Sequence, residues 1–152
     1  LQLTGVEQRL GAAVDAEQLL AGGFDEIVLA TGIRPRKVGF PGSDHPKVVS
    51  YLDVLGGKVS PGRKVAIIGA GGIGFDVAEY LVHEGESPTL DTGRWLAEWG
   101  VAPDFEGAGG LARPRPEAPA REVWLLQRSP GKPGAKLGKT TGWIHRSALK
   151  AK

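Results

Sequence analysis

Residues 64–74 read KVAIIGAGGIG, and this stretch decides the fold of the chain. Its first five residues are apolar without interruption after the lysine, which is typical of a parallel strand buried on both faces. Gly69, Gly71 and Gly74 follow at once in the spacing G-x-G-x-x-G. Apolar residues then recur at helical intervals over 73–83, which predicts a helix. A strand, a glycine-rich turn and a helix in this order predict a Rossmann-like α/β fold built on a βαβ unit.

Each of the three glycines has a separate reason to be present in a dinucleotide site. Gly69 permits the tight turn, Gly71 lets the backbone approach a pyrophosphate, and Gly74 lets the helix pack closely on the strand. Free N–H groups at the start of the helix face the anion, and the helix dipole assists them. We therefore predict a cofactor-binding loop formed by six consecutive residues: Gly69, Ala70, Gly71, Gly72, Ile73 and Gly74. A strand–helix turn without a ligand explains the spacing less well.

A second glycine-containing segment imitates a different phosphate site. Gly138-Lys139-Thr140-Thr141 follows an expected strand and precedes an expected helix, as a P-loop would. A P-loop needs its first glycine at position 133, which is proline. We therefore expect no P-loop.

The residues after the second strand of the βαβ unit, expected over 122–128, select the cofactor. An NAD or FAD site normally carries an acid there to hold the ribose 2′-OH, whereas this strand ends in Arg128, with Lys132 close behind. Cations at this place favour the 2′-phosphate of NADPH, although they could also be solvated loop charges. The usual interval from the glycines is about 20 residues, so the assignment requires 84–120 to be an insert.

Other elements are expected from capping and periodicity. Helical turns are expected to begin at Asp15 and Ser50 and to end at glycine pairs. The further expected elements are a strand at 6–9, a strand at 24–32, a helix at 93–99 carrying Trp95 and Trp99, and a helix at 141–150. Between them, the Pro- and Gly-rich segment 33–63 is typical of a connection between two lobes.

Composition excludes several functional classes. The formal net charge is +2, which argues against nucleic acid as a partner, and no apolar run approaches the ~18 residues of a membrane span. The chain has no cysteine, so it offers no thiolate ligand, and no metal-ligand spacing is present. Without a secretory signal, we expect a cytoplasmic protein. Because the chain has no methionine and begins at Leu1, we expect it to be a piece of a longer polypeptide.

Several motifs together resemble a known group of flavoproteins. Ala30-Thr31-Gly32, the proline-rich crossing and the loop at 69–74 resemble the two-dinucleotide reductases of the glutathione-reductase-like superfamily. The closer resemblance is to bacterial NADPH-dependent 2,4-dienoyl-CoA reductases of the old-yellow-enzyme type. It is carried by 33–36, 41–48, 50–55, 71–76, 126–128 and 138–146 and spans most of 24–146, whereas 1–23 match only loosely.

The resemblance implies a division of the chain. Residues 1–32 would be the end portion of a FAD-binding domain, where Thr31 and Gly32 would contact that cofactor. Residues 33–62 would form the crossing, and 63–152 the first part of the NADPH-binding domain. Asp76 would occupy the place of an acid near the nicotinamide, although an acid near a helix start is also favoured by the dipole.

The resemblance also implies a larger enzyme. An FMN-carrying (β/α)8 barrel, a 4Fe–4S cluster and the rest of the FAD domain would lie elsewhere in the same polypeptide, and that remainder would be the partner of this segment. Electrons would pass from NADPH to FAD, through the cluster to FMN, and then to a dienoyl-CoA of fatty acid β-oxidation. We assign no catalytic residue within the chain and expect the segment alone to be inactive.

Two alternatives stay open. The glycines could hold FAD in a fragment of a related flavoprotein, for which an acid in place of Arg128 would be expected. The chain could instead be a non-catalytic nucleotide-binding module, because it contains no plausible catalytic set.

Overall fold

The computed structural model describes residues 2–36 and 39–152. It divides into two compact units, Leu1–Ser43 and Asp44–Lys152, and each is described by itself below. The division falls inside the segment 33–62 that the sequence marks as a crossing. Within the described ranges, no helix has the length and hydropathy needed to cross a membrane.

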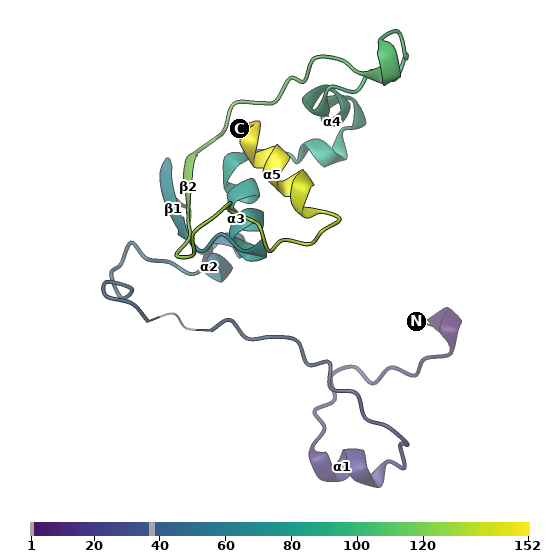
Figure 1. Ribbon diagram of the computed structural model, residues 1–152. Helices are drawn as coiled ribbons and strands as arrows, with labels where there is room; N and C mark the ends of the chain where they lie inside the picture. Colours follow the sequence, from purple (N-terminus) through teal and green to yellow (C-terminus); the bar gives the residue numbers. More distant parts are fainter. Residues whose placement is uncertain (1, 37–38) are drawn as a thin grey trace. The chain divides into compact units, whose positions relative to one another are not determined.

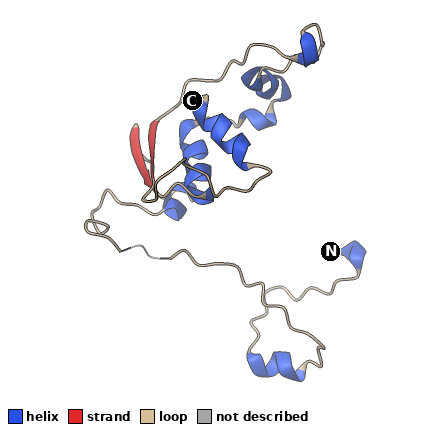
Figure 2. Cartoon of the chain, viewed as in Figure 1, coloured by secondary structure: helices blue, strands red, loops and turns tan. Residues whose placement is uncertain are grey.

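The first unit holds the 3-10 helix η1 (Gln2–Thr4) and the helix α1 (Ala16–Ala21) (Figure 2). The expected cap of α1 is present. The Asp15 carboxylate accepts the Gln18 N–H at 2.9 Å, and the Gln18 side chain accepts the Asp15 N–H at 3.2 Å. This reciprocal capping box and the terminal Gly22 confirm the predicted helix.

The two strands expected in the first unit are absent. Residues 6–9 and 24–32 have no strand pairing, and Val28 and Leu29 are 85% and 79% exposed. Apolar, β-rich sequence forms a strand only when a neighbouring strand completes its hydrogen bonds. No such neighbour exists within the described part of this unit, so the prediction of a strand at 24–32 is wrong for this structure.

The second unit contains the remaining elements in the order α2, β1, α3, η2, α4, η3, β2 and α5 (Figure 1). Their bounds are α2 Tyr51–Leu55, β1 Lys64–Ile68, α3 Gly72–Val82, η2 Pro88–Leu90, α4 Thr92–Trp99, η3 Ala108–Gly110, β2 Glu122–Leu126 and α5 Gly142–Lys150. The strands β1 and β2 pair in parallel, from Lys64 opposite Glu122 to Ile68 opposite Leu126. The predicted βαβ unit is therefore present, with 84–120 inserted between α3 and β2.

The core lies on one face of this two-stranded sheet. Val54 of α2 and Val77 and Leu81 of α3 are buried together. They pack against the inward-facing side chains of the strands, which include Val65, Ile67 and Val123. Helix α3 thus bridges the sheet and α2, and it positions its own N-terminus at the end of β1.

The opposite face of the sheet is open, which corrects the prediction that β1 is buried on both sides. Both strands alternate between exposed and half-buried residues, and Ile68, Trp124 and Leu126 are exposed. A parallel strand is buried on both faces only when helices cover both faces. Among the residues described, α2, α3 and α5 supply no cover for the second face, as Figure 1 shows.

The apolar stripe of α3 also differs from the predicted one. Ile73 and Tyr80, expected on the buried face, are exposed. Phe75 and Ala78 take those places, beside Val77 and Leu81. Gly74 lies against the carbonyl of Gly69, and the face of α3 that carries Gly74, Phe75 and Ala78 is the buried one.

The insert 84–120 is held by ion pairs and aromatic contact. Arg94 of α4 makes a two-point contact with Glu117, with Nε–Oε1 and Nη2–Oε2 distances of 2.7 Å, and this hydrogen bonding lowers the pKa of the Glu117 carboxyl. The rings of Trp95 and Trp99 lie 6.2 Å apart, as their spacing predicts. The side chain of Lys152, 4% exposed, pairs with Glu98 at 2.7 Å.

The core assignment predicts unequal costs for one substitution at two sites. Leu81 is 1% exposed and Leu90 is 74% exposed. We expect Leu81→Ala to lower the free energy of unfolding by about 2–5 kcal/mol, because it removes buried contacts and leaves a cavity. The matched control Leu90→Ala should change it by no more than about 0.5 kcal/mol. Urea denaturation followed by circular dichroism measures both, and equal effects would contradict this core.

Candidate nucleotide-binding site

The glycine loop lies at the carboxyl ends of the two strands. Gly69 has φ +123°, a conformation that side-chain-bearing residues rarely adopt, and its N–H donates to the Leu126 carbonyl at 2.8 Å. The turn out of β1 is therefore joined to the last residue of β2. In an open α/β sheet this edge is where ligands bind.

Gly74 allows the close approach of α3 to the turn. It is buried, and a Cβ atom at this position would overlap the carbonyl oxygen of Gly69. The side chain of Leu125 from β2 would lie 3.6 Å from the same Cβ. A larger residue would have to push the helix away from the strands, so this glycine is required by packing within the chain itself.

Gly71 and Gly72 have a different environment. A Cβ atom at either position would meet nothing within 4 Å, and Gly71 has ordinary extended backbone with φ −91° and ψ −171°. The fold therefore leaves open space above these two residues. As the N-terminal cap, Gly71 supplies no side-chain acceptor to the first N–H groups of α3, which are the groups that bind anions at helix starts. This open cradle fits the pyrophosphate of a dinucleotide.

Ala70, Ile73 and Asp76 complete the predicted loop. Ala70 is half-buried, while Ile73 and Asp76 are exposed. Asp76 is the fifth residue of α3, beyond the first turn in which the helix dipole acts, and its side chain forms no hydrogen bond with the described residues. The dipole therefore does not account for this acid, and its place near a nicotinamide stays a prediction.

The parallel register brings the second predicted group of residues to the same edge. Ile68 pairs with Leu126, and Arg128 follows two residues later in the chain, with Lys132 beyond it. Both cations are exposed. Within 2–36 and 39–152 neither forms an ion pair, so their charges are available to an anionic ligand.

The segment 127–141, which we term the β2–α5 loop, is fastened at three points that the sequence did not indicate. The Gln127 amide donates to the carbonyls of Ser129 and Gly131, each at 2.9 Å. Gly134, buried at φ +72°, lies against Phe75 of α3. The Gly134 carbonyl accepts Arg146 Nη1 at 3.0 Å. No short-range pattern could have revealed contacts that join a loop to two helices.

The other sequence candidates lie elsewhere. Thr31 and Gly32 belong to the first unit, where Gly32 has φ +77°, and their predicted contact with FAD stays a prediction. His145 of α5 contacts Glu79 of α3 through Nδ1 and Oε1 at 2.7 Å, which joins these two helices. His45 accepts the Lys47 N–H at 3.1 Å and stabilises a turn.

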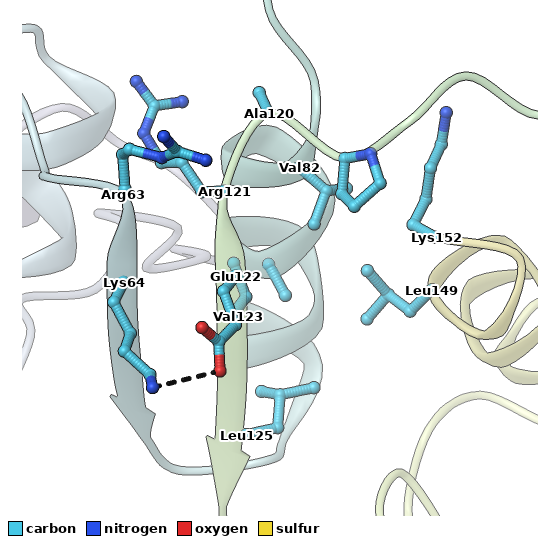
Figure 3. Close-up of a pocket in the computed structure, with 12 residues that line it drawn as sticks. Arg63, Lys64, Val82, Ala120, Arg121, Glu122, Val123, Leu125, Leu149 and Lys152 are labelled. Atoms are coloured by element: carbon cyan, nitrogen blue, oxygen red, sulfur yellow. Dashed lines mark ion pairs between the residues drawn. The ribbon is translucent and has the colours of Figure 1, made fainter.

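A cavity of about 530 Å³ lies at the opposite ends of the strands (Figure 3). Most cations that line it are already engaged. Lys64 pairs with Glu122 at 3.3 Å, and Arg121 donates to the carbonyls of Pro61 and Leu81. Hydrogen bonding from the Trp124 indole, and then from Lys64, lowers the pKa of the Glu122 carboxyl. These groups stabilise the strand starts, so the cavity does not compete with the glycine loop as a nucleotide site.

Comparison with known proteins identifies several oxidoreductases that are similar to part of this chain. The chain is 41% identical over 86 residues to cinnamate reductase of Clostridium sporogenes, covering 57% of this chain and 13% of that protein. It is 37% identical over 94 residues to NADH oxidase of Thermoanaerobacter brockii, covering 59% and 14%. It is 35% identical over 80 residues to bilirubin reductase of Mediterraneibacter gnavus, covering 53% and 12%. The matches thus span about an eighth of the length of these relatives.

The comparison with protein families also identifies an oxidoreductase. Residues 5–105 match the model of the pyridine nucleotide-disulphide oxidoreductases. That domain is Rossmann-like and binds FAD, a nicotinamide dinucleotide or both, in agreement with the parallel βαβ unit and its glycine loop. The chain therefore belongs to the pyridine nucleotide-disulphide oxidoreductase family.

Proposed function

We propose that this chain is the NADPH-binding segment of a flavin-dependent oxidoreductase. The observation that carries the proposal is the meeting of two features at one sheet edge. An open glycine cradle at Gly71 lies beside β2, whose end leads into the unpaired cations Arg128 and Lys132. A pyrophosphate and a 2′-phosphate are the two anions that such a pair of features would bind.

The residues of the chain would hold and orient the nucleotide. The N–H groups at the start of α3 would bind the pyrophosphate, and Arg128 with Lys132 would bind the 2′-phosphate. Asp76, exposed on α3, would lie near the nicotinamide. The bound nucleotide would supply a hydride, which the enzyme would deliver to FAD.

The names of the relatives support a role on the electron-entry side. Reductases named after cinnamate and bilirubin each match more than half of this chain, although those two molecules are chemically unrelated. A segment common to both is expected to carry what they have in common rather than acceptor recognition. We propose further, on the sequence resemblance alone, that the complete enzyme passes electrons through a 4Fe–4S cluster and FMN to an enoyl-type substrate. This chain has no cysteine, so the cluster would be held by another part of the polypeptide.

Two specific observations favour alternatives. One relative is named NADH oxidase, which favours NADH as the donor. The family also binds FAD, which the glycine loop could hold instead. Both alternatives require a nucleotide without a 2′-phosphate, and both leave Arg128 and Lys132 without a ligand.

The glycine cradle can be tested without disturbing the fold. At Gly71 a valine would find open space and a backbone conformation that suits it, so Gly71→Val should fold normally. The added side chain would fill the place of the pyrophosphate, and NADP+ binding should fall below detection in isothermal titration of the complete protein. The matched control is Gly62→Val, which also enters open space but at the other end of β1. Retained binding by a folded Gly71→Val protein would place the ligand elsewhere.

The choice of cofactor rests on charge at the end of β2. Arg128→Glu should remove one charge-assisted contact to the 2′-phosphate and replace it with repulsion. We expect the ratio of kcat/KM for NADPH over NADH to fall roughly 10- to 150-fold. This corresponds to a loss of about 1.5–3 kcal/mol of binding free energy for the 2′-phosphate. Arg113→Glu, the same charge change on the insert, should leave the ratio unaltered. An unchanged ratio in Arg128→Glu would remove Arg128 from the site.

A further inference from the structure

The cations assigned to the 2′-phosphate lie on a loop, and a loop binds selectively only if its backbone is held in place. Arg128 and Lys132 themselves make no ion pair with described residues that would fix them. Their position therefore depends on the backbone of the β2–α5 loop, and the contacts that hold this backbone become part of cofactor selection.

The first contact closes the beginning of the loop. The Gln127 amide group donates to the carbonyls of Ser129 and Gly131. These carbonyls belong to the residues that follow Arg128 and precede Lys132. The amide thus fixes the short turn between the two cations, and it occupies carbonyl oxygens that would repel a phosphate.

The second contact attaches the middle of the loop to the pyrophosphate helix. A Cβ atom on Gly134 would lie 2.8 Å from Cζ of Phe75, so only glycine brings the backbone this close to the ring. Phe75 follows Gly74 directly and is 3% exposed. The loop is therefore positioned relative to the same helix start that would bind the pyrophosphate.

The third contact is a hydrogen bond from α5 that holds Gly134 against Phe75. The Gly134 carbonyl accepts both the Leu137 N–H at 3.1 Å and Nη1 of Arg146 at 3.0 Å. Arg146 is half-buried, which shields its hydrogen bond from water. Among the described residues, it is the one side-chain hydrogen bond between α5 and the centre of the loop.

From this geometry we propose that Arg146 is a positioning residue for selection of the 2′-phosphate, acting through the β2–α5 loop on Arg128 and Lys132. The proposal rests on the proposed function, because it assumes that these two cations bind that phosphate. Arg146 makes no contact with the nucleotide in this scheme. Its bond to Gly134 keeps the loop seated on Phe75, so that the cations and the glycine cradle have a fixed separation.

The test compares two probes that differ in the 2′-phosphate, namely 2′,5′-ADP and 5′-AMP, titrated calorimetrically into the complete protein. Wild type should bind 2′,5′-ADP more tightly. Arg146→Gln should reduce the affinity ratio about 3- to 10-fold, through weaker binding of 2′,5′-ADP with unchanged binding of 5′-AMP. A purely structural role would weaken both probes alike.

Two further variants separate the mechanism from its alternatives. Arg121→Gln removes the bonds of a half-buried arginine to the Pro61 and Leu81 carbonyls, the latter at the other end of α3, and should leave the ratio at the wild-type value. In an Arg128→Gln/Lys132→Gln background, Arg146→Gln should have no additional effect, because it acts through those residues. An independent, additive effect in that background would overturn the positioning role.

The outcomes distinguish this inference from the proposed function. A wild-type protein that binds both probes equally would overturn both. A wild-type preference that Arg128→Gln abolishes and Arg146→Gln leaves intact would overturn only the role of Arg146.

Discussion

The close approach between Gly74 and the carbonyl of Gly69 is the constraint on which the second unit depends. A side chain at Gly74 would overlap that oxygen, so glycine alone lets α3 begin directly beside the turn. The same approach turns Phe75 inward, to 3% exposure, and leaves Gly71 and Gly72 facing open space. One packing requirement therefore produces both the buried seat used by the β2–α5 loop and the open cradle that fits a pyrophosphate.

Helix starts with local signals were predictable from the sequence, and the Asp15 and Ser50 caps are present as expected. The apolar runs Lys64–Ile68 and Glu122–Leu126 were also predicted as strands, and each forms one because the other pairs with it. The segment 24–32 is also apolar at its centre but has no strand to pair with among the described residues of its unit, so it has no regular secondary structure and is exposed. A strand is a property of two segments, and its sequence shows only one of them.

The candidate site shows the same distinction at the level of side chains. The G-x-G-x-x-G spacing and the cations Arg128 and Lys132 could be identified because they follow strands in a known order. The anchors of the β2–α5 loop could not, because Phe75 and Arg146 meet Gly134 only in the folded chain. Thr31 and Gly32 lie in the separate first unit, so their assignment to FAD stays a prediction.

The insert 84–120 lengthens the interval between the glycine loop and Arg128 beyond the usual ~20 residues, but it does not change where Arg128 lies relative to the sheet. The N–H of Ala120 donates to the carbonyl of Val82 at 2.9 Å, so the insert leaves and rejoins the βαβ unit at nearly one point. That point lies where α3 ends and β2 begins, at the edge of the sheet opposite the glycine loop. A closed stem of this kind adds chain length without moving either strand, since loop length at a fixed stem has only a small entropic effect. The register from Ile68 to Leu126 is therefore independent of the insert, and Arg128 reaches the glycine edge despite its distance in sequence.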